Sequence, residues 1–184
     1  IKFDTPESLS AFAGVTLTAD DHTFGGAAMS ARWDLAAQNS LRLQKIADRG
    51  TVTDWSSYPA LRLVAYSDMV SDTRVLVRAT PTEDTYGNAY LERELAIDWT
   101  GWKELFLPLS SFTAYGGMES FESVQGFCLF ALDSTDGEAL LLQGIELVQP
   151  ERDMHMLGAN PAPGSVGIMR EGACVTVGFS NEVG

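Results

Sequence analysis

The sequence predicts an all-β protein, an antiparallel β-sandwich, from two observations. About ten short runs of strand-forming residues follow one another, with Gly, Pro, Asp, Ser and Thr between them. No segment shows the sustained helical periodicity that the crossover helices of a parallel α/β sheet need. Strands that follow one another without helices pair antiparallel and bury one face against a second sheet.

The elements follow from period-two alternation and from turn residues at their ends. In chain order, strands are expected at residues 1–4, 15–18, 28–33, 41–46, 61–66, 74–78, 90–95, 102–107, 126–132 and 139–148. The Gly25-Gly26 turn precedes the third of these strands, and Pro108 ends the eighth. Short helical turns are expected at 6–12 and 109–112, the first because Pro6 suits the first helical position.

Composition and charge narrow the classes of partner. The chain has 184 residues, of which 45% are apolar and 20% charged, which suffices for one well-packed domain. Asp and Glu number 25 against 12 Lys and Arg, a formal net charge of -13. An acidic surface repels phosphate backbones and anionic lipids, and no apolar run is long enough to cross a bilayer. We therefore expect neither a nucleic acid nor a membrane as partner.

The domain organisation changes after Val148. Residues 1–149 are expected to form the sandwich, and the Pro and Gly content of residues 150–165 predicts a linker. Alternation resumes within residues 166–184, which we interpret as the first strand of a following domain, with a strand appended to the sandwich as the alternative. Ile1 opens inside an apparent strand without a signal peptide, so a segment of a larger parent is expected.

The sequence has no recognisable catalytic motif, and we expect no enzymatic activity. It lacks a G-x-S-x-G elbow, a P-loop and an H-E-x-x-H motif, and His22 and His155 lie in separate loop-like segments. Cys128 lies in an apolar run and is expected as a buried thiol, with a disulfide to Cys174 as the alternative. The acidic pair at 92 and 94 shares one strand face, but the polar side of a sandwich strand explains it without catalysis.

Polar and aromatic side chains predict a ligand-binding sheet face. If the polar faces of residues 61–66, 74–78 and 90–95 lie side by side, they present Arg62, Tyr66, Arg78, Tyr90, Glu92 and Glu94. Aromatic rings stack on the C–H surfaces of sugars, and Arg binds hydroxyls or the carboxylates of uronates. An Arg pair would favour an anionic sugar. A solvated face of mixed charge is the alternative, and loop 82–88 is a further candidate.

Four segments carry a resemblance to a known family. They are residues 26–33, 58–67, 140–148 and, most specifically, 95–112 with its motif D-W-T-G-W-K-E-L. Over about residues 1 to 149 the chain resembles the galactose-binding-like β-jelly-roll modules, which occur as carbohydrate-binding modules of bacterial polysaccharide lyases and glycoside hydrolases. The resemblance implies a non-catalytic module of a secreted or cell-surface protein, which binds a polysaccharide and tethers an attached catalytic domain to it.

The resemblance also implies a structural calcium ion. In such modules the ion lies between the first strand, a loop before the Gly-Gly turn and the last strand. The matching positions here are Asp4, Asp21 and Gln143. Calcium takes six to eight oxygen ligands, and Gln143, which stands where the family has Asp, brings an oxygen without charge. A cap on the helical turn that begins at Pro6 is the alternative role of Asp4.

Three other functions remain open for such a fold. A structural spacer or docking domain of a larger polysaccharide-degrading enzyme would have no ligand of its own. An enzyme acting alone would need a deep pocket with perturbed acids. An intracellular assembly factor with the same jelly roll is the third.

Overall fold

The computed structural model describes residues 1–10, 12, 17–43, 46–47 and 51–149, and the backbone of 166–171 and 174–179. The chain divides into two compact units, Ile1–Val148 and Gln149–Gly184. The expected linker at 150–165 lies outside the described residues, as does His155.

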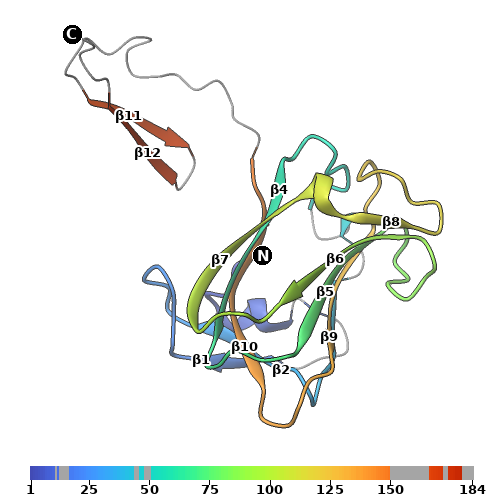
Figure 1. The fold of residues 1–184 in the computed structure, drawn as a ribbon, viewed down its shortest axis with the longest axis horizontal. Helices are drawn as coiled ribbons and strands as arrows, with labels where there is room; N and C mark the ends of the chain where they lie inside the picture. Colours follow the sequence, from blue (N-terminus) through green and yellow to red (C-terminus); the bar gives the residue numbers. More distant parts are fainter. Residues whose placement is uncertain are drawn as a thin grey trace. The chain divides into compact units, whose positions relative to one another are not determined.

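The first unit is a sandwich of two antiparallel five-stranded sheets, which confirms the predicted fold class (Figure 1). The first sheet has the order β1-β2-β10-β4-β7, with β1 at Thr18–Asp20, β2 at Ser30–Asp34, β10 at Ala139–Leu147, β4 at Ala60–Ser67 and β7 at Gly101–Pro108. The second sheet has the order β3-β9-β5-β6-β8, with β3 at Ser40–Leu43, β9 at Gly126–Leu132, β5 at Arg74–Thr80, β6 at Tyr90–Ala96 and β8 at Thr113–Tyr115.

An apolar layer between the two sheets forms the core. Because side chains alternate along a strand, Leu61, Leu63 and Ala65 of β4 point into this layer and the residues between them point outward. Trp33 of β2 is fully buried, and its indole Nε1 donates a hydrogen bond to the carbonyl oxygen of Gln38. Trp99 also belongs to the core. Each sheet therefore has one apolar face inside and one outer face.

The sequence placed most strands correctly, but the strand expected at 15–18 shares only Thr18 with β1, and two further details differ. Residues 1–4 form a single bridge, Lys2 to Gly144, instead of a strand, although the backbone of Phe3 still donates to Gln143. The short strand β8 was not expected because all three of its residues are exposed and leave no apolar face to recognise. The helical turns are the 3-10 helices η1 at Pro6–Ser10 and η3 at Leu109–Ser111.

The second unit contains an antiparallel hairpin of two strands, β11 at Val166–Glu171 and β12 at Cys174–Phe179. One strand was expected in this segment. The side chain of Cys174 lies outside the described residues. In the described part of the chain, no helix is long and apolar enough to span a membrane.

Removing the side chain of Leu129 should destabilise the sandwich strongly. Leu129 is 1% exposed in the middle of β9, so Leu129→Ala should lower the free energy of unfolding by roughly 2–5 kcal/mol, because it leaves a cavity. Leu132→Ala is the matched control in the same strand, since Leu132 is only partly buried and points outward. Urea denaturation measures both, and equal losses would contradict this account of the core.

Candidate functional site

The predicted binding residues lie on opposite outer faces of the sandwich. Arg62 and Tyr66 belong to β4 in the first sheet, whereas Arg78, Tyr90 and Glu92 belong to β5 and β6 in the second. The prediction that these polar faces lie side by side is therefore wrong. The chain crosses between the sheets after β4, and alternation within a strand does not indicate which sheet the strand joins.

The outer face of the second sheet, here called the second-sheet face, carries most of the candidate site. Strand register places Arg42, Cys128, Arg78, Glu92 and Thr113 opposite one another in a single row across all five strands. A neighbouring row begins with Ser40 and Phe130. Chain segments far apart in sequence thus contribute to one surface.

Arg78 and Glu92 form a shielded ion pair at the centre of this face. Nε and Nη2 of Arg78 both donate to Oε2 of Glu92, at 2.9 and 2.6 Å, and the two side chains are 15% and 14% exposed. The guanidinium also lies 3.7 Å from the ring centroid of Tyr90 and 5.0 Å from that of Phe130. In the described part of the chain, Arg78 Nη1 and Glu92 Oε1 have no hydrogen-bond partner.

Two exposed tyrosines lie on either side of the ion pair along the strand order. Tyr115 of β8 is 43% exposed and stacks on Tyr90, with ring centroids 4.8 Å apart. Tyr86, 56% exposed, contacts Phe130 of β9 with ring centroids 5.5 Å apart. Its hydroxyl lies 3.2 Å from the hydroxyl of Ser40. The second-sheet face therefore combines exposed rings with a fixed pair of charged groups.

Loop 82–88, a candidate from the sequence, folds onto the second-sheet face and holds Tyr86 there. A Cβ at Gly126 would lie 2.5 Å from Oγ1 of Thr80 and 2.9 Å from the carbonyl oxygen of Thr82, so only glycine leaves room for the loop. Asp84 fixes the turn by accepting a hydrogen bond from the backbone of Tyr86 at 3.0 Å. The position of Tyr86 thus depends on a residue of β9.

Cys128 lies beneath this loop as a free and fully buried thiol. Its Sγ–H donates to the carbonyl oxygen of Thr85 at 3.9 Å. Burial raises the pKa of Cys128 to about 12, which keeps the thiol protonated and unreactive at neutral pH. Cys128 therefore packs the site and does no chemistry in it.

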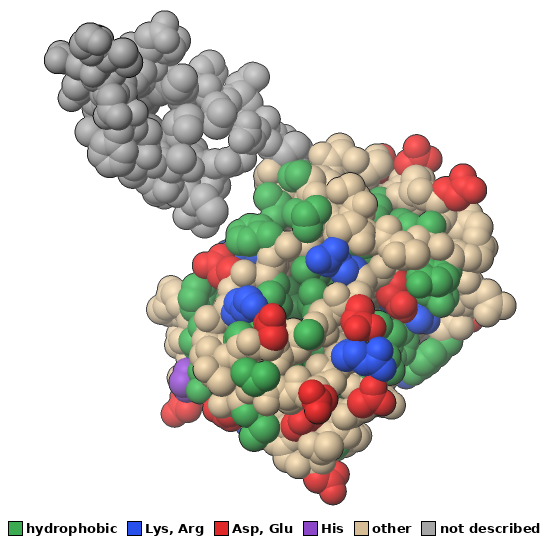
Figure 2. All heavy atoms as spheres, viewed as in Figure 1, with side chains coloured by type: hydrophobic (Ala, Val, Ile, Leu, Met, Phe, Trp, Pro, Cys, Tyr) green, Lys and Arg blue, Asp and Glu red, His purple; other side chains and the backbone are tan. Residues whose placement is uncertain are grey.

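The acidic pair of β6 is neutralised rather than poised for catalysis. Glu92 is bound to Arg78, and Glu94 accepts a hydrogen bond from Arg74 at 3.2 Å. Arg74 also binds Asp133 at 2.7 Å. Paired charges of this kind are what the alternative of a mixed-charge sheet face predicts, although Arg78 and Glu92 are shielded from solvent. Figure 2 shows Lys and Arg side chains beside Asp and Glu in the view it gives.

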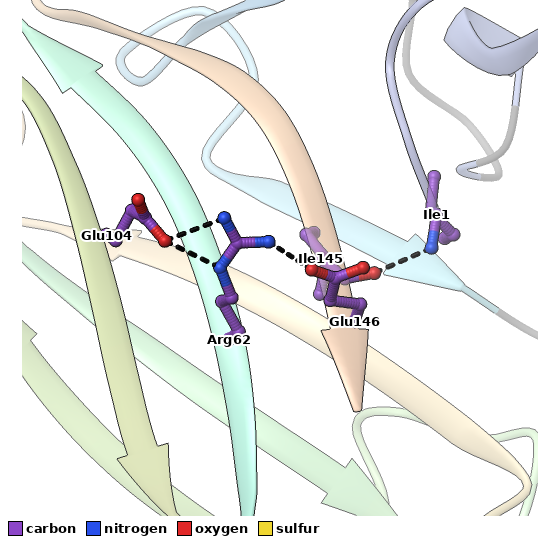
Figure 3. Close-up of polar contacts among 5 residues, drawn as sticks. All are labelled: Ile1, Arg62, Glu104, Ile145 and Glu146. Atoms are coloured by element: carbon purple, nitrogen blue, oxygen red, sulfur yellow. Dashed lines mark hydrogen bonds and ion pairs between the residues drawn. The ribbon is translucent and has the colours of Figure 1, made fainter. Parts of the chain in front are cut away.

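Arg62, on the first sheet, is fully engaged with two carboxylates. Its Nε and Nη2 donate to Oε2 of Glu104 at 2.8 and 2.7 Å, and its Nη1 donates to Glu146 (Figure 3). Burial alone would lower the pKa of Arg62, but these bonds outweigh it and raise that pKa. Figure 3 also shows the backbone nitrogen of Ile1 donating to Ile145 beside this pair. Arg62 therefore links β7, β4 and β10.

Tyr66 is packed into a ring cluster on the first sheet. Its ring centroid lies 4.2 Å from that of His22 and 5.5 Å from that of Trp102, and Phe24 contacts Trp102 in turn. A hydrogen bond with the Asp68 carboxylate raises the pKa of Tyr66. These neighbours hold the ring and the hydroxyl of Tyr66 in place.

The residues expected to bind calcium are not arranged as a metal site. Asp4 and Asp21 are exposed, and among the described residues no three side chains of His, Cys, Asp or Glu gather where they could hold a metal ion. Gln143 is buried and directs Nε2, a donor, at the carbonyl oxygens of Phe3 and Met29. The NH₂ group of an amide is a hydrogen-bond donor and does not bind calcium, which takes oxygen ligands, so these residues do not fit the ion.

Sequence reasoning missed Phe130, Ser40 and Arg42, included Tyr86 only as part of the candidate loop 82–88, and did not place Tyr115 among the expected binding residues. Phe130 occupies the same strand face as Cys128, two residues earlier, so the alternation of β9 contains the signal. Nothing local to residues 113–115 indicates that they form a strand beside β6.

Comparison with known proteins gives structural matches only. No family model matches the chain, and no curated protein matches it. The chain is similar to a family 11 carbohydrate-binding module of a cellulosomal cellulase of Clostridium thermocellum, with 11% identity, 73% of this chain and 81% of that one covered, and a TM-score of 0.51. The chain therefore has the jelly-roll sandwich fold of carbohydrate-binding modules.

Two further structures have lower scores. A family 30 carbohydrate-binding module is 13% identical over 73% of this chain and 84% of that one, with a TM-score of 0.47. The glycoside hydrolase domain of Endo-D from Streptococcus pneumoniae R6 is 14% identical, with a TM-score of 0.46. In that match 92% of this chain and 26% of that one are covered.

Stability should fall in alkali because of Cys128. A thiol whose pKa is higher in the folded protein stabilises it fully below the unfolded pKa, near 9.0, and loses that contribution as the pH rises toward about 12. Between pH 9.0 and about pH 12, the Tm of the wild type should therefore fall more than the Tm of Cys128→Ala. Tyrosine ionisation affects both proteins equally, so parallel pH profiles would contradict the burial of this thiol.

Proposed function

We propose that this chain is a non-catalytic carbohydrate-binding module that binds a polysaccharide on the second-sheet face. The observation that carries the proposal is the Arg78–Glu92 pair with exposed tyrosine rings on both sides of it along the strand order. The fold shared with a family 11 carbohydrate-binding module supports it.

The chemistry of this face suits a sugar. The faces of Tyr86 and Tyr115 offer flat apolar surfaces for the C–H side of a pyranose ring. Between them, Arg78 Nη1 can donate to one hydroxyl and Glu92 Oε1 can accept from another. A few polar groups among aromatic rings are the usual composition of a small-molecule site.

The charges favour a neutral polysaccharide over one rich in uronates. The arginine pair expected to select an anionic sugar, Arg62 and Arg78, is split between the two faces, and both members are bound to carboxylates. Arg74 is likewise paired, whereas Arg42 lies over the Tyr86 ring. With a net charge of -13 on the chain, a uronate gains little here and is repelled at longer range.

The biological role follows from such binding. A module of this kind tethers an attached carbohydrate-active enzyme to its polysaccharide outside the cell, because a weak contact raises the local concentration of the catalytic domain. An activity of the module's own is not part of the proposal. The cavity between its sheets is lined by apolar side chains such as Trp33 and Trp99, and the strand-face carboxylates are paired.

The exposed tyrosines provide the first test of the site. Tyr115→Ala and Tyr86→Ala should each weaken binding to a neutral polysaccharide roughly tenfold, because each removes a stacking surface. Phe106→Ala is the matched control, since Phe106 is an aromatic residue 50% exposed on the first sheet, and its affinity should equal that of the wild type. Affinity gel electrophoresis against β-glucan, xylan, galactomannan and polygalacturonate measures all four proteins.

Three results would contradict the proposal. Folded protein that binds none of these polysaccharides would identify a structural spacer instead. Tighter binding to polygalacturonate than to every neutral polymer would refute the preference for a neutral ligand. A loss of affinity in Phe106→Ala alone would move the site to the first sheet.

The guanidinium of Arg78 provides a second test that separates the two faces. Arg78→Lys keeps the positive charge beside Glu92 but loses the planar guanidinium and its several N–H donors, so binding should weaken several-fold while the fold is retained. Arg62→Lys makes the same change on the first sheet and should leave the affinity unchanged. Isothermal titration calorimetry with an oligosaccharide of the best polymer compares them, and equal losses would count against the second-sheet face.

A further inference from the structure

Gln143 lies at an irregularity in β10 where three parts of the chain meet. The pairing register between β10 and β4 shifts between Leu142 and Gly144, so Gln143 has no partner residue in β4. Its side chain is buried, with 9% of the residue exposed. The backbone of Phe3 pairs with this position, since its nitrogen donates to the carbonyl oxygen of Gln143 at 3.0 Å.

The amide of Gln143 holds both the first residues of the chain and the loop between β1 and β2. Its Nε2 donates to the carbonyl oxygens of Phe3 and Met29, each at 2.9 Å. Its Oε1 accepts a hydrogen bond from the backbone nitrogen of Phe24 at 3.1 Å. One side chain thus satisfies three backbone groups from two segments that are distant in sequence from β10 and from each other.

The same loop packs against Tyr66 and Trp102 on the outer face of the first sheet. Its Phe24 and His22 rings contact Trp102 and Tyr66, and the hydroxyl of Ser30 closes the loop by donating to the carbonyl oxygen of His22 at 2.8 Å. The hydrogen bonds of Gln143 therefore position the loop that completes the ring cluster.

The carbonyl oxygens of Phe3 and Met29 both point at one atom, and two such acceptors need either a cation or hydrogen-bond donors between them. A calcium ion could bind two such oxygens, but it requires six to eight oxygen ligands that include carboxylates. The carboxylates expected for it, Asp4 and Asp21, are exposed. A primary amide provides the donors instead, because its two N–H groups can each donate to one carbonyl oxygen while its own oxygen accepts a third hydrogen bond. The observed contacts use both donors and the acceptor of Gln143.

We propose that the side-chain amide of Gln143 replaces the structural calcium ion that the family resemblance implies, so that this module folds without a metal. The amide ties together the first residues, the loop before β2 and the last strand of the sandwich, which are the three parts the ion would connect. The proposal concerns stability and is independent of which ligand the second-sheet face binds.

Thermal unfolding in calcium and in chelator tests this assignment. The wild type should have the same Tm in 5 mM CaCl2 and in EDTA. Gln143→Ala should lower the Tm by roughly 5 °C or more in both, because three backbone groups lose their partner and two of these hydrogen bonds are buried. Gln125→Glu is the control for the variant Gln143→Glu described next. It adds the same charge at a partly buried glutamine that precedes β9, and it should change the Tm little.

The near-isosteric variant Gln143→Glu gives the decisive comparison. It places a carboxylate oxygen, in place of the two N–H donors, against the carbonyl oxygens of Phe3 and Met29, so its Tm should fall in EDTA as that of Gln143→Ala does. A wild-type Tm that rises in calcium, or an unchanged Tm for Gln143→Ala or for a folded Gln143→Glu, would overturn the proposal. If Gln143→Glu does not fold, the wild type and Gln143→Ala decide.

Discussion

The apolar layer between the two sheets determines where every other side chain of the sandwich can lie. Each strand sends alternate residues into this layer, so the remaining residues face outward on whichever sheet the strand has joined. Leu63 and Leu129 both belong to the core between the sheets, while Arg62 and Cys128 lie on opposite outer faces. Membership of a sheet, which is decided by long-range pairing, thus determines which polar residues can act together.

The second-sheet face is organised before any ligand arrives. Arg78 is held by the rings of Tyr90 and Phe130 and by Glu92, so little side-chain freedom remains to be lost on binding. A shielded ion pair adds little to stability by itself, because desolvation offsets the attraction between the charges. Its value lies in fixed geometry: one donor and one acceptor stay in constant positions between two exposed rings.

Much of the fold was predictable from the sequence, because strands and turns leave local signals. Alternation and turn residues located the described sandwich strands except β8, although the strand expected at 15–18 shares only Thr18 with β1. The exception, β8, has three exposed residues that show no apolar side. Alternation also placed Arg78, Tyr90 and Glu92 on one face correctly, since β5 and β6 are consecutive and paired.

The rest of the candidate site could not be predicted because it depends on contacts between distant segments. Arg62 and Tyr66 have the same residue types as Arg78 and Tyr90, and nothing local distinguishes the two pairs. The family resemblance implied Gln143 as a metal ligand, but the direction of its amide depends on Phe3 and Met29. Neither a sheet assignment nor an amide orientation is encoded within a window of a few residues.

Similar residues therefore have different roles on the two faces of this sandwich. On the first sheet, Arg62 is saturated by two carboxylates and the Tyr66 ring lies under His22, so these groups hold strands and a loop together. On the second sheet, Tyr115 is exposed and Arg78 keeps a free Nη1 among the described residues. A side chain whose polar atoms and ring faces already have partners within the protein stabilises the fold. Only side chains with unpaired polar atoms or exposed rings can bind a ligand. By this criterion the outer face of the first sheet maintains the structure, and the second-sheet face is the one proposed to bind.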